Sequence, residues 1–356
     1  MTGRGIDQIL PEAGGPRLFE PYVKDARNYI ALAERRNGPI DRPVRPDYIW
    51  GDALQELNQR QPDLRFINLE TSITTSDSPW PDKSIHYRMH PGNIDCLMAA
   101  HPHGCSVANN HVLDWDYPGL RDTLSFLNKA GIKPVGAGER LPQAARPAIF
   151  DLGRKRRVIV CACAVQTSGV PESWGATADR EGVFRLPDLS DASVDRIADI
   201  IMPLKRAGDL AVLSIHWGSN WGYHLETGQD MFAHRVIDRA GVDLVHGHSS
   251  HHPRGMEVYR EKLILYGCGD FINDYEGIGG HEDYRGDLVL MYFPRLCHET
   301  GKLQSLDMVP LQMHRFQLRH PVWQDREWLA STLAKINRTL GTTCDLEPEG
   351  FLKLAW

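Results

Sequence analysis

The stretch "DLAVLSIHWGSNWGYHLETGQDMFAHRVIDRAGVDLVHGHSSHH" (209–252) is the part of the chain that best indicates the fold class. Its first ten residues are mostly apolar and predict a buried strand that ends near His216. Residues 229–241 have the spacing of an amphipathic helix, and residues 242–248 predict a second strand that ends at His248. A strand, a helix and a strand in this order are typical of a parallel sheet, so we predict an α/β fold.

Similar elements are expected on both sides of this stretch. They are strands at 64–70, 105–111 and 156–165, helices at 118–131 and 192–208, a hairpin at 256–267 with a tight turn near Arg260–Glu261, strands at 286–293 and 303–313, and a helix near 326–340. Early alternation followed by a run of strands favours a sheet-rich α/β domain with α+β character. Because no clear linker interrupts the pattern, we predict a single domain over residues 1–356, with 296–356 as a C-terminal extension.

The composition is that of an ordinary globular protein. The chain has 356 residues, of which 42% are hydrophobic and 24% charged, and its seven cysteines form no CxxC pair. A net charge of -6 gives no electrostatic reason to expect nucleic acid as a partner. No segment approaches the roughly 20 apolar residues of a membrane helix, and the first residues do not have the pattern of a signal peptide. The chain as written is therefore expected to be cytoplasmic, with export open if the true start lies upstream.

The predicted strands share a chemical property at their ends. They stop at Glu70, Asn110–His111, His216 and His248. In open α/β sheets, ligands bind beyond the carboxyl ends of strands. Carboxylate, amide and imidazole donors together suit manganese, iron or zinc, and the lack of cysteine at these ends disfavours a structural thiolate zinc site.

Each of these residues alone also suits an ordinary structural role. The acid fits a solvated strand end, the amide fits a turn, and a lone histidine is usually hydrogen-bonded in a core. The histidine cluster at 246–252 also fits a polar loop. Their common position at strand ends is what favours a metal site.

Two further features have two readings each. Trp217 and Trp221 lie among glycines in "HWGSNWGYH" (216–224), so they either line a substrate groove or form a packed corner. Asp114 either orients the side chain of His111 or caps the helix that follows. The residues alone leave both choices open.

Several motifs together resemble the CapA family. They are "NLE" (68–70), "ANNHVLDWDYPGLRDTL" (108–124), "GAG" (136–138), "SIHWG" (214–218), "GHSSHH" (247–252) and "LILYGCGDFINDYEG" (263–277). The resemblance extends to about residue 295. CapA proteins are associated with bacterial capsule and poly-γ-glutamate biosynthesis, and they look like a branch of the calcineurin-like metallophosphatases. The resemblance implies a four-layer αββα sandwich with a site for two divalent metal ions.

Carried over to this chain, the resemblance implies a role for each motif residue. The implied metal ligands are Glu70, Asn110, His216, His248 and His251. His111 would face the scissile group and either protonate the leaving group or stabilise the transition state, while metal-bound water supplies the nucleophile. His246 matches less well and is expected at the strand end or behind the ligands.

The chain departs from the family pattern at two places. The family opens with a strand ending in Gly-Asp, whereas Met1 lies inside that motif, so we expect the first strand and its metal-binding aspartate to be absent. Arg4 would then contact an anion near the site, or be a flexible terminal residue. The usual "GN-F" is "GDF" here. Asp270 therefore adds a carboxylate that supports a ligating histidine or serves as a turn acid.

These observations leave open three functions. The first is a metal-dependent hydrolase of the phosphoesterase type, acting on an anionic small molecule or polymer in capsule, poly-γ-glutamate or cell-wall polymer biosynthesis. The second is a non-catalytic metal-binding accessory protein that works with the polymer-synthesis machinery. The third is an amide hydrolase that cleaves γ-glutamyl bonds with the same metal site. Fold resemblance does not choose among them, because function depends on the site.

Overall fold

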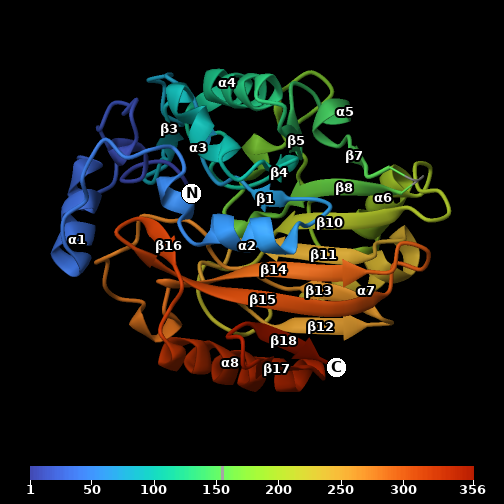
Figure 1. Cartoon of the computed structure of the whole chain (residues 1–356). Coiled ribbons are helices and arrows are strands. Elements are labelled where there is room, and N and C mark those ends of the chain that lie inside the picture. The colour runs from blue at the N-terminus through green and yellow to red at the C-terminus, as the bar shows by residue number, and fades with distance from the viewer. Residues whose placement is uncertain (154–155) are drawn as a thin grey trace. The chain divides into compact units, whose positions relative to one another are not determined.

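The structure, a computed structural model, describes residues 1–153 and 156–356 (Figure 1). Its alternating helices and strands, in parallel and antiparallel sheets, confirm the predicted α/β (α+β) fold class. The chain divides into two compact units, each assembled from separate stretches. Unit 1 comprises Met1–Pro134, Asp270–Val289 and Leu311–His320, and unit 2 comprises Val135–Gly269, Leu290–Pro310 and Pro321–Trp356. The division into one domain with a C-terminal extension stays a prediction.

Unit 1 contains short strands and four α-helices among its described residues. Its helices are α1 (Arg27–Asn37), α2 (Ala53–Arg60), α3 (Ile94–Met98) and α4 (Asp116–Lys129). Its strands are β1 (Phe66–Asn68), β2 (Ser72–Ile73), β3 (Arg88–Met89), β4 (Gly104–Ser106), β16 (Gln317–Arg319) and β5 (Lys133–Val135), which ends at the unit boundary.

The sheet of unit 1 has the order β1-β4-β5 and ends earlier than expected. Strands β1 and β4 run parallel, and their last partners are Asn68 and Ser106. Glu70 and the residues 109–111 therefore lie in the loops that follow the strands rather than inside them. Helix α4 begins at Asp116, close to the predicted start, and buries Leu120 and Leu127.

Unit 2 is built around a six-stranded sheet with the order β12-β13-β11-β10-β8-β7. These strands are β7 (Ala148–Asp151), β8 (Arg157–Ala164), β10 (Leu210–His216), β11 (Leu244–His248), β12 (Met256–Tyr259) and β13 (Lys262–Leu265). Strands β8, β10, β11 and β13 run parallel to one another, whereas the edge strands β7 and β12 pair antiparallel with β8 and β13. The quoted stretch 209–252 thus forms the predicted strand, helix and parallel strand.

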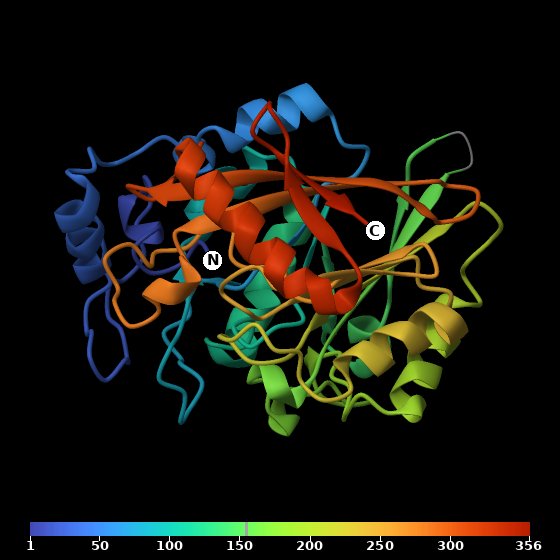
Figure 2. The same ribbon diagram turned by 90° about the horizontal axis from the view of Figure 1, so that it is seen from below.

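Helices α6 (Asp191–Ile201) and α7 (Gln229–Ala240) cover one face of this sheet and lie side by side (Figure 2). Ile215 and Val245 belong to the apolar cluster that also contains the buried residues of both helices. Because side chains alternate along a strand, Ser214 and His216 must stand on the opposite face of β10. The sheet therefore separates an apolar face from a face that carries polar side chains.

The remaining elements of unit 2 are short strands, two longer strands and two helices. They are β6 (Ala137–Gly138), α5 (Leu141–Ala144), β9 (Gly182–Val183), β14 (Leu288–Leu296), β15 (Leu303–His314), α8 (Trp323–Asn337), β17 (Thr343–Leu346) and β18 (Leu352–Ala355). Strands β14 and β15 each have a few residues in unit 1. Helix α8, red in Figure 2, packs against β17.

The hairpin predicted at 256–267 is confirmed. Strands β12 and β13 pair antiparallel, with Tyr259 opposite Lys262. The two turn residues have positive φ, 47° at Arg260 and 63° at Glu261, as a two-residue hairpin turn requires. Within the part of the chain that the structure describes, no helix combines the length and the apolar character that crossing a membrane would require.

Candidate functional site

The loop after β4 is held in place by Asn109 rather than by strand pairing. Its buried side chain donates from Nδ2 to Asn68 Oδ1 (3.0 Å) and Leu69 O (2.9 Å), and its Oδ1 accepts from His111 N (3.1 Å). These bonds replace the ladder that stops at Ser106. Asn109 therefore fixes the backbone from which its neighbours Asn110 and His111 project.

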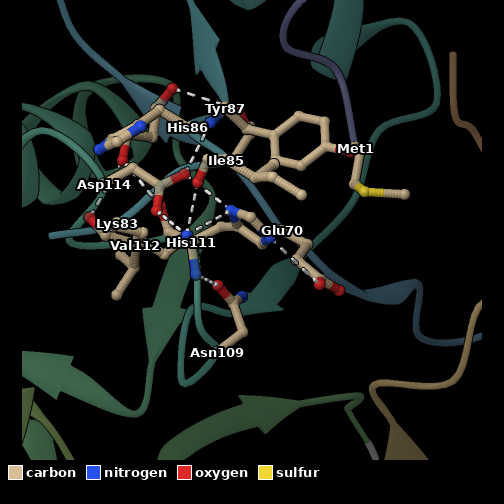
Figure 3. Close-up of polar contacts among 12 residues, drawn as sticks. Met1, Glu70, Lys83, Ile85, His86, Tyr87, Asn109, His111, Val112 and Asp114 are labelled. Carbon is tan, nitrogen blue, oxygen red and sulfur yellow. Dashed lines mark hydrogen bonds and ion pairs between the residues drawn. The ribbon is translucent and has the colours of Figure 1, made fainter. Parts of the chain in front are cut away.

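His111 forms a buried pair with Asp114 (Figure 3). Its Nδ1 lies 2.7 Å from Asp114 Oδ2, which also accepts from Tyr87 N at 2.6 Å. The ring of Tyr87 packs edge to face with the imidazole, with centroids 4.5 Å apart. Helix α4 has Trp115 as its N-cap residue, with no side-chain cap bond. Of the two roles expected for Asp114, the structure therefore shows the orientation of His111 and not the helix cap.

A lysine that the sequence did not single out completes this group. Lys83 Nζ lies 2.6 Å from Asp114 Oδ1 and donates to Ile85 O at 2.7 Å. Burial raises the pKa of the Asp114 carboxyl, but the nearby charges of His111 and Lys83 outweigh this effect, and the pKa lies below its usual value. Asp114 is therefore an ionised, completely buried carboxylate at neutral pH.

Glu70 and Asn110 lie next to this pair in unit 1. Glu70 Oε1 is 4.0 Å from His111 Nε2, and its Oε2 accepts from Asn68 Nδ2 at 2.9 Å. The Oδ1 atom of Asn110 is buried and has no hydrogen-bond partner among the described residues. A buried amide oxygen without a partner is costly, so a bound water molecule or a cation at this position would satisfy it.

Arg4 is part of the interior of unit 1. Only 4% of the residue is exposed, and its guanidinium forms two bonds to Asp274, at 2.5 and 3.1 Å, and one to Glu20 at 2.8 Å. The guanidinium also lies 4.0 Å from the ring centre of Tyr29 and 4.4 Å from that of Tyr87. Two carboxylates of the chain itself thus neutralise Arg4, and the expected flexible terminal arginine is not what the structure shows.

Asp270 lies in the same unit and is 9% exposed. Its Oδ2 accepts from Asn273 Nδ2 at 3.1 Å, which ties the start of the segment 270–289 into a local turn. Its neighbour Asp274, which no sequence pattern marked, is the residue that holds Arg4.

Unit 2 brings together the histidines at the ends of β10 and β11. His216 and His248 are partners in the parallel register, and their Nδ1 atoms are 2.7 Å apart. Ser214 and His246 are also partners. Ser214 Oγ lies 3.0 Å from His246 Nδ1 and 3.0 Å from His248 Nε2, so the hydroxyl links the two rings. Ser214 could have been found from the sequence, because it precedes His216 by two positions on the same strand face.

The imidazoles of His246 and His248 are neutral at physiological pH. Burial lowers the pKa of His246 to about 4. It also lowers the pKa of His248 well below the usual value, with further contributions from His216 and His246. A metal binds the neutral form of imidazole, so the sheet keeps these side chains in the form that a ligand needs.

The two tryptophans in the loop after β10 have different environments. Trp217 is buried, donates from Nε1 to Tyr266 O (2.9 Å) and stacks on the ring of Tyr266, so it belongs to the packed core. Trp221 is partly exposed, and its ring centre lies 5.4 Å from that of His251. Gly218 between them has a φ of 76°, which strains other residues.

The donor types in both units fit a divalent metal ion. Unit 1 offers the carboxylate of Glu70 and the amide oxygen of Asn110, and unit 2 offers the neutral imidazoles of His246 and His248. Among residues 1–153 and 156–356, no three histidine, cysteine, aspartate or glutamate side chains are gathered closely enough to hold a metal. The two-metal site therefore stays a prediction.

Comparisons with known proteins agree with the resemblance seen in the motifs. A Mycobacterium tuberculosis protein named "probable polyglutamine synthesis accessory protein" is 49% identical over 355 residues, which cover 99% of this chain and 93% of that protein. The "capsule biosynthesis protein CapA" of Bacillus anthracis is 28% identical over 318 residues, covering 88% of this chain and 65% of that protein. The "PGA biosynthesis protein CapA" of Bacillus subtilis is 28% identical over 315 residues, covering 88% and 70%.

The family described as "bacterial capsule synthesis protein PGA_cap" matches residues 1–275, which is well over half of the chain. The motifs that resemble CapA proteins, from "NLE" to "LILYGCGDFINDYEG", lie within or at the end of this range. The chain belongs to the bacterial capsule synthesis protein PGA_cap family.

Proposed function

We propose that this protein acts in the synthesis of a glutamate-containing polymer of the bacterial capsule or cell wall, together with the polymer-synthesis machinery. Support comes from its family and from the names of its relatives, which refer to polyglutamine synthesis, capsule biosynthesis and PGA biosynthesis. Within this role we propose the activity of a metal-dependent hydrolase.

The observation that carries the proposed hydrolase activity is the buried pair of His111 and Asp114. An ionised carboxylate that accepts from Nδ1 at 2.7 Å fixes both the ring orientation and the tautomer of the imidazole. The other ring nitrogen, Nε2, then lies on the side of Glu70. A histidine held in this way by a carboxylate is a common arrangement for proton transfer in hydrolysis.

In the proposed reaction, His111 first takes up a proton at Nε2 from solvent, so that both ring nitrogens are protonated. It then gives the Nε2 proton to the leaving oxygen of a phosphoester or the leaving nitrogen of an amide. Asp114, which accepts from Nδ1, stabilises the positive charge of the imidazolium while the proton is carried. Glu70 and Asn110, and in unit 2 His216, His248 and His251, would be the metal ligands. A bound divalent ion such as manganese, iron or zinc would supply hydroxide at neutral pH and stabilise negative charge.

The charge of the chain is a further argument for a metal. A glutamate polymer is polyanionic, whereas the protein has a net charge of -6, so long-range attraction does not favour binding. The basic groups near His111 are already engaged, since Lys83 binds Asp114 and Arg4 binds Asp274 and Glu20. A divalent ion at the site would provide the positive charge that an anionic substrate requires.

The test combines metal content with turnover. The purified chain is loaded in turn with manganese, iron or zinc and offered γ-linked glutamate oligomers, a phosphomonoester and a phosphodiester. We expect one substrate to be cleaved and His111→Ala to abolish most of this turnover while the bound metal stays. A wild-type protein that binds metal but cleaves none of these substrates contradicts the hydrolase.

The second candidate function is a non-catalytic accessory protein, which the name of the 49% identical relative favours. It predicts binding of a glutamate polymer or of a polymer synthase without cleavage. Equilibrium binding of γ-linked glutamate oligomers by the wild type and by His111→Ala separates the two. An accessory protein binds equally well in both forms and shows no product.

A further inference from the structure

We infer that Lys83 is a positioning residue of the His111–Asp114 pair, because its ammonium group holds the Asp114 carboxylate in the orientation that fixes the His111 ring. The inference deepens the function proposed above and rests on it for the catalytic role of His111. It concerns a residue 28 positions away from His111, in the segment between β2 and β3.

The two oxygens of Asp114 have different partners. Oδ1 faces Lys83 Nζ at 2.6 Å, whereas Oδ2 accepts from Tyr87 N at 2.6 Å and faces His111 Nδ1 at 2.7 Å. Because the carboxylate is held on both sides, it cannot rotate without losing the ion pair of Oδ1 with Lys83 and the hydrogen bonds of Oδ2 with Tyr87 and His111. Among the described residues, Lys83 is the cation that pairs with Oδ1.

Lys83 itself is held in place. Its Nζ donates to the carbonyl of Ile85 at 2.7 Å, and only 19% of its side chain is exposed. Lys83 and Tyr87, in the segment between β2 and β3, thus give an ammonium and an amide to a single carboxylate, and the carbonyl of Ile85 holds the ammonium in place (Figure 3). This arrangement leaves the lysine little freedom to serve a substrate instead.

The distances also determine which hydrogen bond the ring makes. Lys83 Nζ is 3.2 Å from His111 Nδ1, but a ring nitrogen that donates to Asp114 cannot accept from Lys83. The shorter contact to the ionised carboxylate prevails, so Nδ1 carries the proton and donates it to Oδ2. Lys83 therefore acts on His111 through Asp114 and not by a bond to the ring.

Loss of the ammonium group would leave Oδ1 buried without a charged partner. An ionised carboxylate in this position is costly, and it relaxes by turning or by taking up a proton. Either change weakens the bond from Nδ1. The ring would then lose its fixed orientation even though His111 and Asp114 are both present.

The experiment observes the Nδ1 proton of His111 by nuclear magnetic resonance in the full, metal-free chain with ¹⁵N-labelled histidine. His111→Gln assigns the signal. We expect the signal in the wild type and in Lys83→Arg, which keeps the charge. In Lys83→Met we expect loss of the signal or at least about tenfold faster exchange with water, as for an Nδ1–H that has lost its acceptor. Should Lys83→Met fail to fold, Lys83→Gln gives the same test, since it also removes the charge.

Lys205→Met is the matched control. Lys205 forms an ion pair of the same length, 2.6 Å, with the buried Asp243 in unit 2, and its side chain is 20% exposed. This variant should leave the His111 signal unchanged. A His111 signal with wild-type exchange in Lys83→Met, or in Lys83→Gln where that variant replaces it, overturns the inference.

Turnover measured on the same proteins separates this inference from the proposed function. If the wild type shows no turnover, the proposed hydrolase activity is wrong. The NMR signal of the His111 Nδ1 proton still tests whether Lys83 positions the pair. If the hydrolase is active, Lys83→Met should lower kcat with little change in KM, and Lys83→Arg should restore most of it. An active enzyme whose kcat is the same in Lys83→Met contradicts the positioning role alone.

Discussion

The Nδ1 atoms of His216 and His248 lie 2.7 Å apart because the two residues are directly paired partners on parallel strands. At this distance one nitrogen donates a proton and the other accepts it, so the two rings share one hydrogen bond. The register of β10 and β11, and not the flexibility of a loop, sets the separation. A ligand that binds the Nδ1 atoms of both rings must replace this hydrogen bond.

The metal-free protein should lose stability as the pH falls below about 6.5. Burial lowers the pKa of His246 to about 4 in the folded state, whereas the unfolded chain takes up the proton near 6.5. Protonation therefore favours the unfolded state between these values. One such group removes about 2 kcal/mol from the free energy of unfolding between pH 6.5 and 5. Urea unfolding across this range, with a chelator present, measures the slope.

The control for this prediction is a pair of glutamine variants. His246→Gln should flatten the profile by about one proton. His224→Gln, at a histidine exposed in the folded protein, should keep the wild-type slope. Identical slopes in all three proteins would show that His246 is not the source of the effect.

Alanine substitution should lower the free energy of unfolding much more at Asn109 than at its neighbour Asn110. Asn109→Ala removes hydrogen bonds to Asn68, Leu69 and His111 and should lower the free energy of unfolding by about 2 to 3 kcal/mol. Asn110→Ala removes an oxygen without a partner among the described residues and should change it by less than about 0.5 kcal/mol in metal-free protein.

For metal affinity, we expect Asn110 to be the more important of the two residues. Asn110→Ala should lower metal affinity at least about tenfold, as calorimetric titration would measure. An alanine variant that binds metal as tightly as the wild type would contradict the assignment of Asn110 as a ligand.

Arg4 should be one of the most sensitive positions in unit 1. Arg4→Met leaves Asp274 and Glu20 buried without their cation and should cost about 3 to 5 kcal/mol of unfolding free energy. Arg27→Met, which breaks the exposed pair with Asp25, should leave the midpoint of urea unfolding unchanged. Similar midpoints for both variants would contradict the buried role of Arg4.

Of the two tryptophans in the loop after β10, Trp217 should contribute more to stability, and Trp221 should report metal binding. Trp217→Phe removes the bond to Tyr266 O and the stacked contact, and should cost about 2 kcal/mol. Trp221→Phe should cost less than about 1 kcal/mol, because the residue is partly exposed.

Fluorescence gives the second readout for this pair. Addition of metal should change the emission of the wild type and of Trp217→Phe through Trp221, which lies beside His251. The change should be absent from Trp221→Phe. A metal response that depends on Trp217 instead would contradict the assignment of His251 as a ligand.

The sequence predicted the elements whose signals are local. Strands β10 and β11 and the hairpin with its turn at Arg260–Glu261 follow from apolar runs and the short interval between them. Helix α1 was missed although Tyr29, Ile30 and Ala33 form its buried face. Strands β1 and β4 are shorter than predicted, because beyond Asn68 and Ser106 the side-chain hydrogen bonds of Asn109, and not backbone pairing, hold the chain.

The site was harder to predict from the sequence, because the residues that make its important contacts are far apart in the chain. A single lysine in the proline-containing loop "SPWPDKS" (78–84) has no periodicity that would mark it, so only the folded chain shows Lys83 against Asp114. Arg4 near the first residue read as exposed or anion-binding for the same reason. Its partner Asp274 follows 270 positions later.

That separation has a consequence for biosynthesis. At about 5 to 20 residues per second, the ribosome adds Asp274 on the order of tens of seconds after Arg4. Until then the guanidinium of the nascent chain lacks the carboxylate that binds it twice, and Glu20 is the one acid of its folded surroundings already translated. The first part of unit 1 therefore waits for residues translated after most of unit 2, so translation order alone delays its completion.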